Sequence, residues 1–288
     1  MRSCEHPLMH RFRSLLVLVF VLGSPIGSEA QDRSSRVSPR QPESADHEGS
    51  IEHQTASRLA NPIPYMVSLP FQLNFDRGYG ANHDGHVFTG KFQPIIPFEI
   101  TKDWDYVTRT IIPFKWQNDI DNQNDEGFGA PLFETFFMPR CLRRDVFGIG
   151  PFFSAPALSG SRFGTQETGA GVSAVALWRP LHWTIGVLTY QSFDIGGSDG
   201  SGTANVTYWQ PIISYVNDDA YTFTLNTESQ LNWDDGSASN PMNLLVGKTV
   251  SIGDQLIQFL VGGRYYLTSS PEGATGFGGR AMITFAFP

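Results

Sequence analysis

The stretch from His86 to Trp116 constrains the fold more than any other part of the chain. In its first arm one parity is apolar and the other polar, with Phe88, Phe92, Ile96 and Phe98 against Thr89, Lys91 and Gln93. The second arm repeats this pattern, with Tyr106, Ile112, Phe114 and Trp116 against Arg109 and Lys115. A period of two predicts a pair of half-buried β-strands. Each arm has about 11–13 residues, close to what a tilted strand needs to cross a bilayer.

The rest of the chain repeats this unit and yields twelve strand candidates. They are predicted at 65–75, in the two arms of 86–116, and at 130–138, 146–154, 170–178, 183–193, 206–216, 221–233, 243–251, 257–267 and 277–287. Alternation also explains why 13% aromatic and only 17% charged residues leave no long apolar run. Beyond the N-terminal segment nothing reaches the length of a spanning helix, so only a closed barrel could cross a membrane.

The connections alternate between long and short. Long, turn-rich segments follow the odd-numbered strands, for example 77–85, 117–127, 194–202 and 269–276, whereas short turns such as 101–105, 179–182 and 217–220 follow the even-numbered ones. This alternation is typical of short periplasmic turns and long extracellular loops. The sequence therefore predicts an all-β, transmembrane, antiparallel up-and-down β-barrel of about 12 strands. A soluble β-sandwich or β-barrel is the alternative.

Proline is the contrary observation. Six prolines fall inside the predicted strands, namely Pro70, Pro94, Pro97, Pro113, Pro151 and Pro211. Each removes a ladder donor, and a closed barrel has no edge strand on which to place it. Either the strand limits differ there or the strands are bulged, and a parity change at Tyr208-Trp209 separately suggests a bulge.

Residues 1–30 have the features of a secretory signal peptide. Arginines precede the apolar run from Leu15 to Leu22, and Ser28-Glu29-Ala30 offers small residues for cleavage before Gln31. A membrane anchor is the alternative, but this run is too short to span.

Residues 31–60 are polar and read as a flexible periplasmic leader, with a possible helical turn over 51–59, and the barrel then occupies 61–288. After cleavage Cys141 is the one cysteine left, which excludes an intrachain disulfide.

Several short segments resemble one family. They are Asn61-Pro62, Val67 to Asn74, Gln93 to Phe98, Asp103-Trp104, Thr108 to Pro113, Phe147 to Pro151, Ser173 to Leu177 and the end from Phe285 to Pro288. Together they resemble a Gram-negative family of outer-membrane barrels labelled "transporter" or neuromedin U-like, allied to the family named for the phenol-degradation meta pathway. The resemblance covers roughly 61–288 and implies an outer-membrane location, an uptake role and in-strand prolines. It brings no catalytic residues, and Phe287 is penultimate where many outer-membrane proteins end on an aromatic residue.

Charged side chains are expected inside the barrel, because the apolar parity faces lipid. The lumen-facing set comprises the basic residues Lys91, Arg109, Lys115, Arg264 and Arg280 and the acidic residues Glu134 and Glu228. The last strand pairs with the first at closure, so the basic residues bracket the first strand. We expect a basic wall that favours anions if the lumen is open. The alternative is a plugged interior in which these charges pair for structure alone.

The long loops are acidic. They carry Asp76, Asp84, Asp119, Asp121, Asp125, Glu126, Glu167, Asp194, Asp199, Asp234, Asp235 and Glu272 against Arg77 and Arg162. The segment 117–127 resembles oxygen-rich calcium loops but lacks the EF-hand spacing. We therefore expect solvated loops beside outer-membrane lipid and lipopolysaccharide, and no metal or cofactor.

Catalytic arrangements are not evident in the sequence. None of the seven histidines lies mid-strand with a serine and an orienting carboxylate, and paired carboxylates occur only in loops. A net charge of −8 argues against nucleic acid. We predict that the chain is not an enzyme but an outer-membrane channel or transporter-like barrel for a small solute, anionic or hydrophobic, inserted by the barrel-assembly machinery. A structural or surface-adhesive barrel without transport is the alternative.

Overall fold

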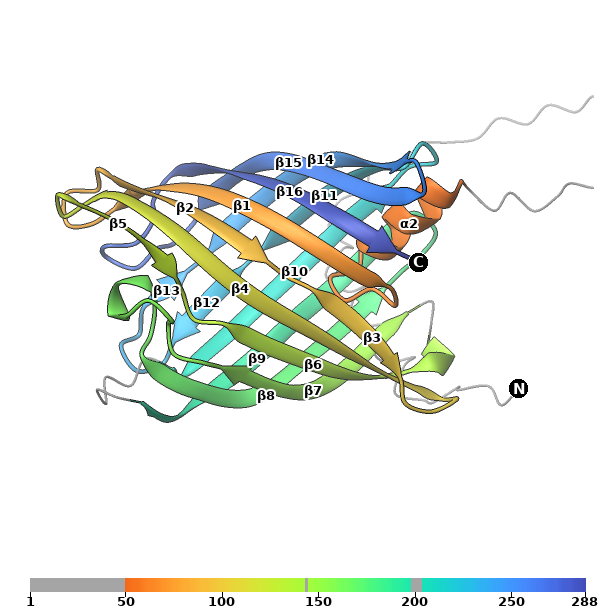
Figure 1. Ribbon diagram of the computed structural model, residues 1–288, viewed down its shortest axis with the longest axis horizontal. Helices are drawn as coiled ribbons and strands as arrows, with labels where there is room; N and C mark the ends of the chain where they lie inside the picture. Colours follow the sequence, from red (N-terminus) through yellow and green to blue (C-terminus); the bar gives the residue numbers. More distant parts are fainter. Residues whose placement is uncertain (1–49, 143–144, 198–203) are drawn as a thin grey trace, which may run out of the picture. The chain divides into compact units, whose positions relative to one another are not determined.

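The computed structural model describes residues 50–142, 145–197 and 204–288. The predicted signal peptide at 1–30 and the predicted leader up to residue 49 lie outside this part. The described residues form a helix, two short 3-10 turns and a 16-stranded sheet (Figure 1). The elements are α2 (Ile51–Leu59), β1 (Val67–Tyr79), β2 (Gly85–Phe92), β3 (Ile95–Glu99), β4 (Trp104–Ile120), β5 (Gln123–Phe128), β6 (Leu132–Pro139), η1 (Arg140–Leu142), β7 (Val146–Ser154), η2 (Ser161–Phe163), β8 (Glu167–Trp178), β9 (Trp183–Gly197), β10 (Val206–Val216), β11 (Tyr221–Thr227), β12 (Ser229–Asn232), β13 (Ala238–Ser239), β14 (Pro241–Ile252), β15 (Gln255–Tyr266) and β16 (Phe277–Phe287).

The sheet closes on itself. Four pairs of consecutive strands run in line and act as single barrel strands: β2 with β3, β5 with β6, β11 with β12, and β13 with β14. All neighbours are antiparallel, and β1 pairs with β16 from Val67↔Phe287 to Phe75↔Gly279. The fold is therefore a closed barrel of 12 antiparallel strands, as the sequence predicts.

The outer surface of this barrel is apolar. On β1, Phe71 and Leu73 are 48% and 43% exposed, whereas the intervening Gln72 is 7% exposed. The same alternation recurs around the ring, so the apolar outer surface far exceeds the patches that soluble monomers expose. A closed barrel with this surface satisfies its backbone internally and suits a bilayer.

The prolines lie where the hydrogen-bond ladder is interrupted. Pro94 falls in the break between β2 and β3. The other five each have a register partner on one neighbouring strand only: Pro70, Pro97, Pro113, Pro151 and Pro211. Pro211, for example, pairs with Val187 on β9 and faces the junction of β11 and β12 on its other side. Proline has no backbone N–H to donate, so in an open sheet it is confined to edge strands. In this closed barrel the gaps in the ladder accommodate it instead.

The predicted bulge in β10 is wrong. The register between β10 and β9 is continuous from Thr207↔Gln191 to Tyr215↔Trp183. The change of parity arises because Tyr208, a large aromatic residue, faces the lumen.

The segment 117–127, predicted as a long loop, is mostly a β-hairpin. β4 continues to Ile120 and β5 begins at Gln123, so only Asp121 and Asn122 form the turn, with φ of 53° and 61°. Asp and Asn tolerate this left-handed conformation better than most residues. The carboxylates of the supposed calcium-like loop are consequently spread over two strands and a turn.

The N-terminal described residues close the short-turn end of the barrel. Helix α2 lies at the end where β16 terminates (Figure 1). Beyond α2, Ile63 is fully buried among apolar residues that point inward from β3 to β10: Ile95, Val107, Phe136, Met138, Val146, Val175, Leu177, Leu188 and Ile212. Residues 50–66 are hereafter termed the plug. The helical turn predicted over 51–59 is confirmed as α2, and it packs on the barrel, although the sequence analysis placed it in a flexible leader.

Three hydrogen bonds stabilise α2, one at its own start and two to the barrel. The Ser50 hydroxyl caps the helix by accepting from the His53 amide at 3.2 Å. Arg179, from the turn between β8 and β9, donates to the Ser57 carbonyl at 2.6 Å. The Ser251 hydroxyl of β14 donates to the Glu52 carboxylate, and this hydrogen bond lowers the pKa of Glu52.

Among the described residues, no helix has both the length and the apolar character that a membrane span requires.

Candidate functional site: the charged lumen

The structure places all seven predicted lumen charges on the inner face. Six of them line one cavity of about 270 Å³: Lys91 from β2, Arg109 and Lys115 from β4, Glu134 from β6, Glu228 from the β11–β12 junction, and Arg264 from β15. Arg280, from β16, lines the neighbouring cavity beside the plug. Closure of β16 onto β1 brings basic residues from both ends of the barrel sequence together.

Two arginine–glutamate pairs lie inside the barrel, one between register partners on the neighbouring strands β4 and β6 and one between β16 and the β11–β12 junction. Arg109 Nη1 lies 3.0 Å from Glu134 Oε2, and the Glu134 side chain is 1% exposed. Arg280 donates to both carboxylate oxygens of Glu228, at 2.6 Å and 2.8 Å. The bidentate geometry favours charge-assisted hydrogen bonds, and each buried carboxylate therefore has a compensating charge.

A relay of amide side chains connects these two pairs. Arg109 Nη2 donates to Gln93 Oε1 at 2.8 Å, and Gln93 donates to Gln72 at 3.1 Å. Gln72 donates in turn to Asn74 at 3.1 Å, and Asn74 accepts from Arg280 Nε at 2.8 Å. The relay fixes the guanidinium groups on the wall formed by β1, β2, β4 and β16.

A third ion pair was missed by the sequence analysis. Asp76, which we assigned to a loop, lies on β1 and is 3% exposed. Its Oδ2 is 3.3 Å from Arg264 Nη1. Its parity, shared with Gln72 and Asn74, was the available signal, and the turn-rich residues after it obscured that signal.

The two lysines differ from the arginines. In the part of the chain that the structure describes, neither the Lys91 nor the Lys115 side chain forms a hydrogen bond or a close ion pair, and the Lys91 ammonium is attracted to the Glu228 carboxylate only at longer range. Both are half-buried and line the 270 Å³ cavity as well as a larger one beside it. The basic excess of the lumen therefore consists of two ammonium groups facing open space.

An aromatic ladder lines the same cavities. Phe152 stacks on Tyr190 with ring centroids 4.0 Å apart, and Tyr190 stacks on Tyr208 at 4.9 Å, both at 12° between ring planes. These residues share the inward parity of β7, β9 and β10. The sequence analysis missed the ladder because it assigned aromatic residues to the outer face.

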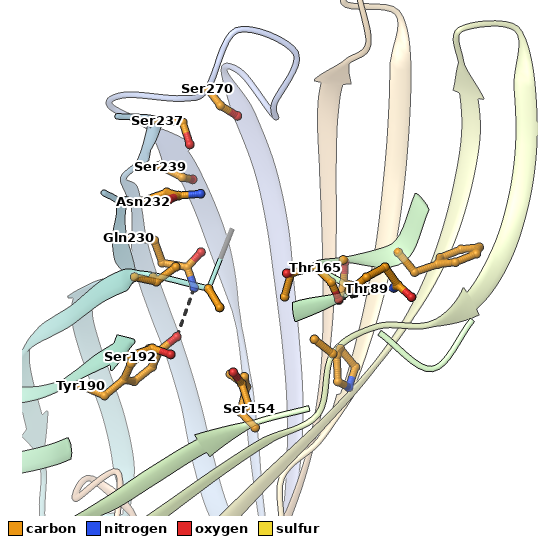
Figure 2. Close-up of a pocket in the computed structure, with 18 of the residues that line it drawn as sticks. Thr89, Ser154, Thr165, Tyr190, Ser192, Gln230, Asn232, Ser237, Ser239 and Ser270 are labelled. Atoms are coloured by element: carbon orange, nitrogen blue, oxygen red, sulfur yellow. Dashed lines mark hydrogen bonds between the residues drawn. The ribbon is translucent and has the colours of Figure 1, made fainter. Parts of the chain in front are cut away.

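A polar vestibule of about 670 Å³ lies on the long-loop side. Figure 2 shows hydroxyl and amide side chains around it, including Thr89, Ser154, Thr165, Ser192, Gln230, Asn232, Ser237, Ser239 and Ser270. Gln230 Nε2 lies 3.5 Å from the Tyr190 hydroxyl (Figure 2). The vestibule shares Lys91, Lys115 and Tyr190 with the 270 Å³ cavity, so the two adjoin.

The lumen narrows toward the plug. The next cavity holds about 100 Å³ and is lined by Leu59, Asn61 and Pro64 together with barrel residues. A cavity of about 450 Å³, lined by Arg58, Asn61 and Tyr65, opens on the other side of the plug. Asn61 thus separates the two, and it is 1% exposed and bonded to Ile63 through both its side-chain amide and its side-chain oxygen, each at 2.9 Å.

Solved structures similar to this chain are outer-membrane barrels of Gram-negative bacteria. An outer membrane channel from Pseudomonas putida F1 aligns with 78% of this chain and 97% of its own, with a TM-score of 0.61 and 12% identity. Outer membrane phospholipase A from Escherichia coli aligns with 83% of this chain and 99% of its own, with a TM-score of 0.41 and 11% identity. The sequence matches no protein-family model and no curated protein. At these identities the likeness to the channel shows the fold alone.

The prediction that the chain is not an enzyme is wrong, because enzymatic activity is not excluded. It rested on the lack of a recognisable catalytic arrangement in the sequence. Outer-membrane barrels that align with this chain include a phospholipase, so a barrel of this kind does not exclude catalysis. That distant likeness assigns no catalytic role to any residue here.

Proposed function

We propose that the chain is an outer-membrane channel for a small anionic solute and that its own plug closes it at the short-turn end. The observation that carries the proposal is the pair of unpartnered lysines, Lys91 and Lys115, facing the vestibule. A cavity lined by one excess sign of charge concentrates ions of the opposite sign. The arginines are paired with carboxylates, so they do not add to the excess positive charge of the lumen.

The aromatic ladder supports a solute with an apolar part. Tyr190 lines both the vestibule and the charged cavity, together with the two lysines. An aromatic face offers apolar contact area beside a charged group, which is how small-molecule sites combine affinity with orientation. The sequence analysis predicted a solute that is either anionic or hydrophobic. We propose a solute that has both an anionic group and an apolar part.

Passage to the short-turn side requires the plug to move. Ile63 fills the apolar end of the lumen, and α2 is fastened to turns of the barrel. The described state is therefore the closed state of the proposed channel.

Location and family belong to the same proposal. The apolar outer face and the fold support insertion into the outer membrane, beside lipopolysaccharide and by way of the barrel-assembly machinery, after export with the signal at 1–30. The prolines at ladder gaps support kinship with the neuromedin U-like transporter barrels that the sequence resembles.

The experiment is a reversal-potential measurement in planar bilayers under a KCl gradient. We expect openings of the full chain to favour chloride, and the double variant Lys91→Gln/Lys115→Gln to lose this preference. Lys248→Gln is the matched control, because Lys248 shares the outward parity of Leu244 and Val246 on β14, lies 4.4 Å from the centre of the Tyr221 ring, and lines none of the cavities described above. Unchanged selectivity in the double variant, or cation selectivity in the unmodified chain, would contradict the proposal.

The alternative function is a structural or adhesive barrel without transport. The buried plug favours it, since a permanently closed lumen passes nothing. Absence of conductance both in the full chain and in a chain without its plug would establish this alternative.

A further inference from the structure

Two histidines and an aspartate meet where the plug touches the barrel rim. His53 lies on α2, His182 ends the turn between β8 and β9, and Asp218 lies in the turn between β10 and β11. One potential ligand atom from each residue lies within 4.8 Å of the other two. Pairing of β9 with β10 brings His182 and Asp218 together, and docking of α2 adds His53.

The three side chains lie somewhat farther apart than the ligands of a bound metal ion. His182 Nε2 is 3.8 Å from Asp218 Oδ1, and the rings of His53 and His182 have centroids 5.6 Å apart at 71°. Ligand atoms about 2.0–2.1 Å from a tetrahedral ion lie roughly 3.4 Å from one another. The side chain of Asp218 is 90% exposed, so its rotation brings the carboxylate into range without moving the backbone.

The hydrogen bonding of His53 prepares it as a ligand. His53 Nδ1 lies 2.8 Å from the Asn217 carbonyl oxygen. A carbonyl only accepts, so Nδ1 carries the proton, and Nε2 keeps its lone pair. Histidines that bind metals almost always donate their other ring N–H to a carbonyl or carboxylate in this way. The residue after Asn217 is Asp218, so one turn supplies both the orienting carbonyl and a ligand.

His182 adds a second, independent observation. Its Nδ1 is buried and has no hydrogen-bond partner among the described residues. Its Nε2 lies 3.8 Å from Asp218 Oδ1, so it is the nitrogen that faces the carboxylate. Nε2 is therefore the nitrogen of His182 that is available to a metal ion shared with Asp218.

We propose that His53, His182 and Asp218 bind one divalent transition-metal ion, of which Zn²⁺ is the representative, and that the bound ion clasps the plug to the rim. Two imidazoles and one carboxylate suit Zn²⁺, whereas Ca²⁺ and Mg²⁺ require oxygen ligands throughout. A solvent molecule completes the coordination on the exposed side. Because His53 belongs to the plug and the other two ligands to the barrel, the ion stabilises the docked plug.

Zinc binding is tested on the purified full chain in detergent, by competition with a chromophoric zinc chelator. We expect one site per chain, and at least a tenfold loss of affinity in His182→Ala and in Asp218→Ala. His83→Ala is the matched control, since His83 lies in the connection between β1 and β2 and its Nδ1 also contacts a carbonyl, that of Gly78 at 3.0 Å. Absence of binding, or equal affinity in all four proteins, would overturn the site.

The clasp is tested by trypsin cleavage after Arg58, which is exposed on α2. Zn²⁺ is expected to slow release of the N-terminal fragment several-fold in the unmodified chain and to have no effect on His182→Ala, while Ca²⁺ protects neither. Zinc binding without this protection would overturn the clasp.

Discussion

Along the strands from β3 to β10, the long-loop and short-turn halves of the lumen have opposite chemistry. On β6 the inward residue changes from Glu134 to Phe136 in one step of the alternation, and both are at most 1% exposed. On β4 the inward series runs from Lys115 and Arg109 to Val107. The long-loop half holds ions, amides and open volume. In the short-turn half the wall from β3 to β10 is an apolar core completed by the plug, and it faces buried polar residues such as Ser68, Thr222 and Gln258 on the other strands.

This difference shows that the alternation decides which face a residue takes but not what fills the space inside. An apolar inner half has no lipid to meet and needs an apolar partner. That partner is Ile63, supplied by the segment just before β1. A polar inner half meets water or solute, so it can remain open.

The largest effect is expected from breaking a paired charge in the long-loop half. Arg109→Met leaves Glu134 buried without its ion-pair partner, which costs about 3–5 kcal/mol. We expect this loss in the free energy of unfolding measured by urea titration in lipid vesicles.

Lys115→Met serves as the comparison, because it removes an unpartnered charge from the same strand. We expect its stability to change by less than about 1 kcal/mol. Equal losses in the two variants would show that ion pairing does not distinguish the arginines from the lysines.

A smaller effect is expected in the apolar half. Ile63→Ala leaves a cavity that costs about 2–5 kcal/mol, and the loss falls on docking of the plug. Cleavage after Arg58 should then accelerate roughly 30-fold or more, at 1.4 kcal/mol per factor of ten. Ile283→Ala, on the outer face at 40% exposure, should leave the cleavage rate unchanged. Equal acceleration of cleavage in both variants would show that Ile63 does not stabilise docking of the plug.

The smallest effect is expected at the start of α2. Ser50→Ala removes the N-cap and costs about 1 kcal/mol of helix stability. We expect faster amide hydrogen exchange over the first turn of α2 and unchanged exchange in the barrel strands. Faster exchange throughout β14 and β15 would instead show that the plug and the barrel unfold as one unit.

Much of the barrel could be predicted because strand parity is a local property. The period of two located the twelve barrel strands and put Lys91, Arg109 and Glu134 on the inner face. Loop lengths then indicated which end carries the short turns.

What failed depends on contacts across the lumen, which no local pattern contains. The helical turn at 51–59 was predicted, but its docking on the barrel was not, because α2 is polar by composition and its partners lie far away in the sequence. The aromatic ladder was missed because the sequence pattern does not distinguish an aromatic residue that faces the lumen from one that faces lipid. Tyr208, which faces the lumen, was therefore interpreted as a change of parity caused by a bulge. Asp76 was lost because β1 extends past the point where turn residues begin.

The central claim is that the plug separates a lysine-bearing vestibule from the short-turn side. Its most direct test is single-channel conductance of the full chain and of a variant lacking residues 51–64, after circular dichroism has shown that both are folded barrels. The account predicts a mostly closed full chain and a steadily open, anion-selective variant. Equal conductance in the two proteins would contradict it.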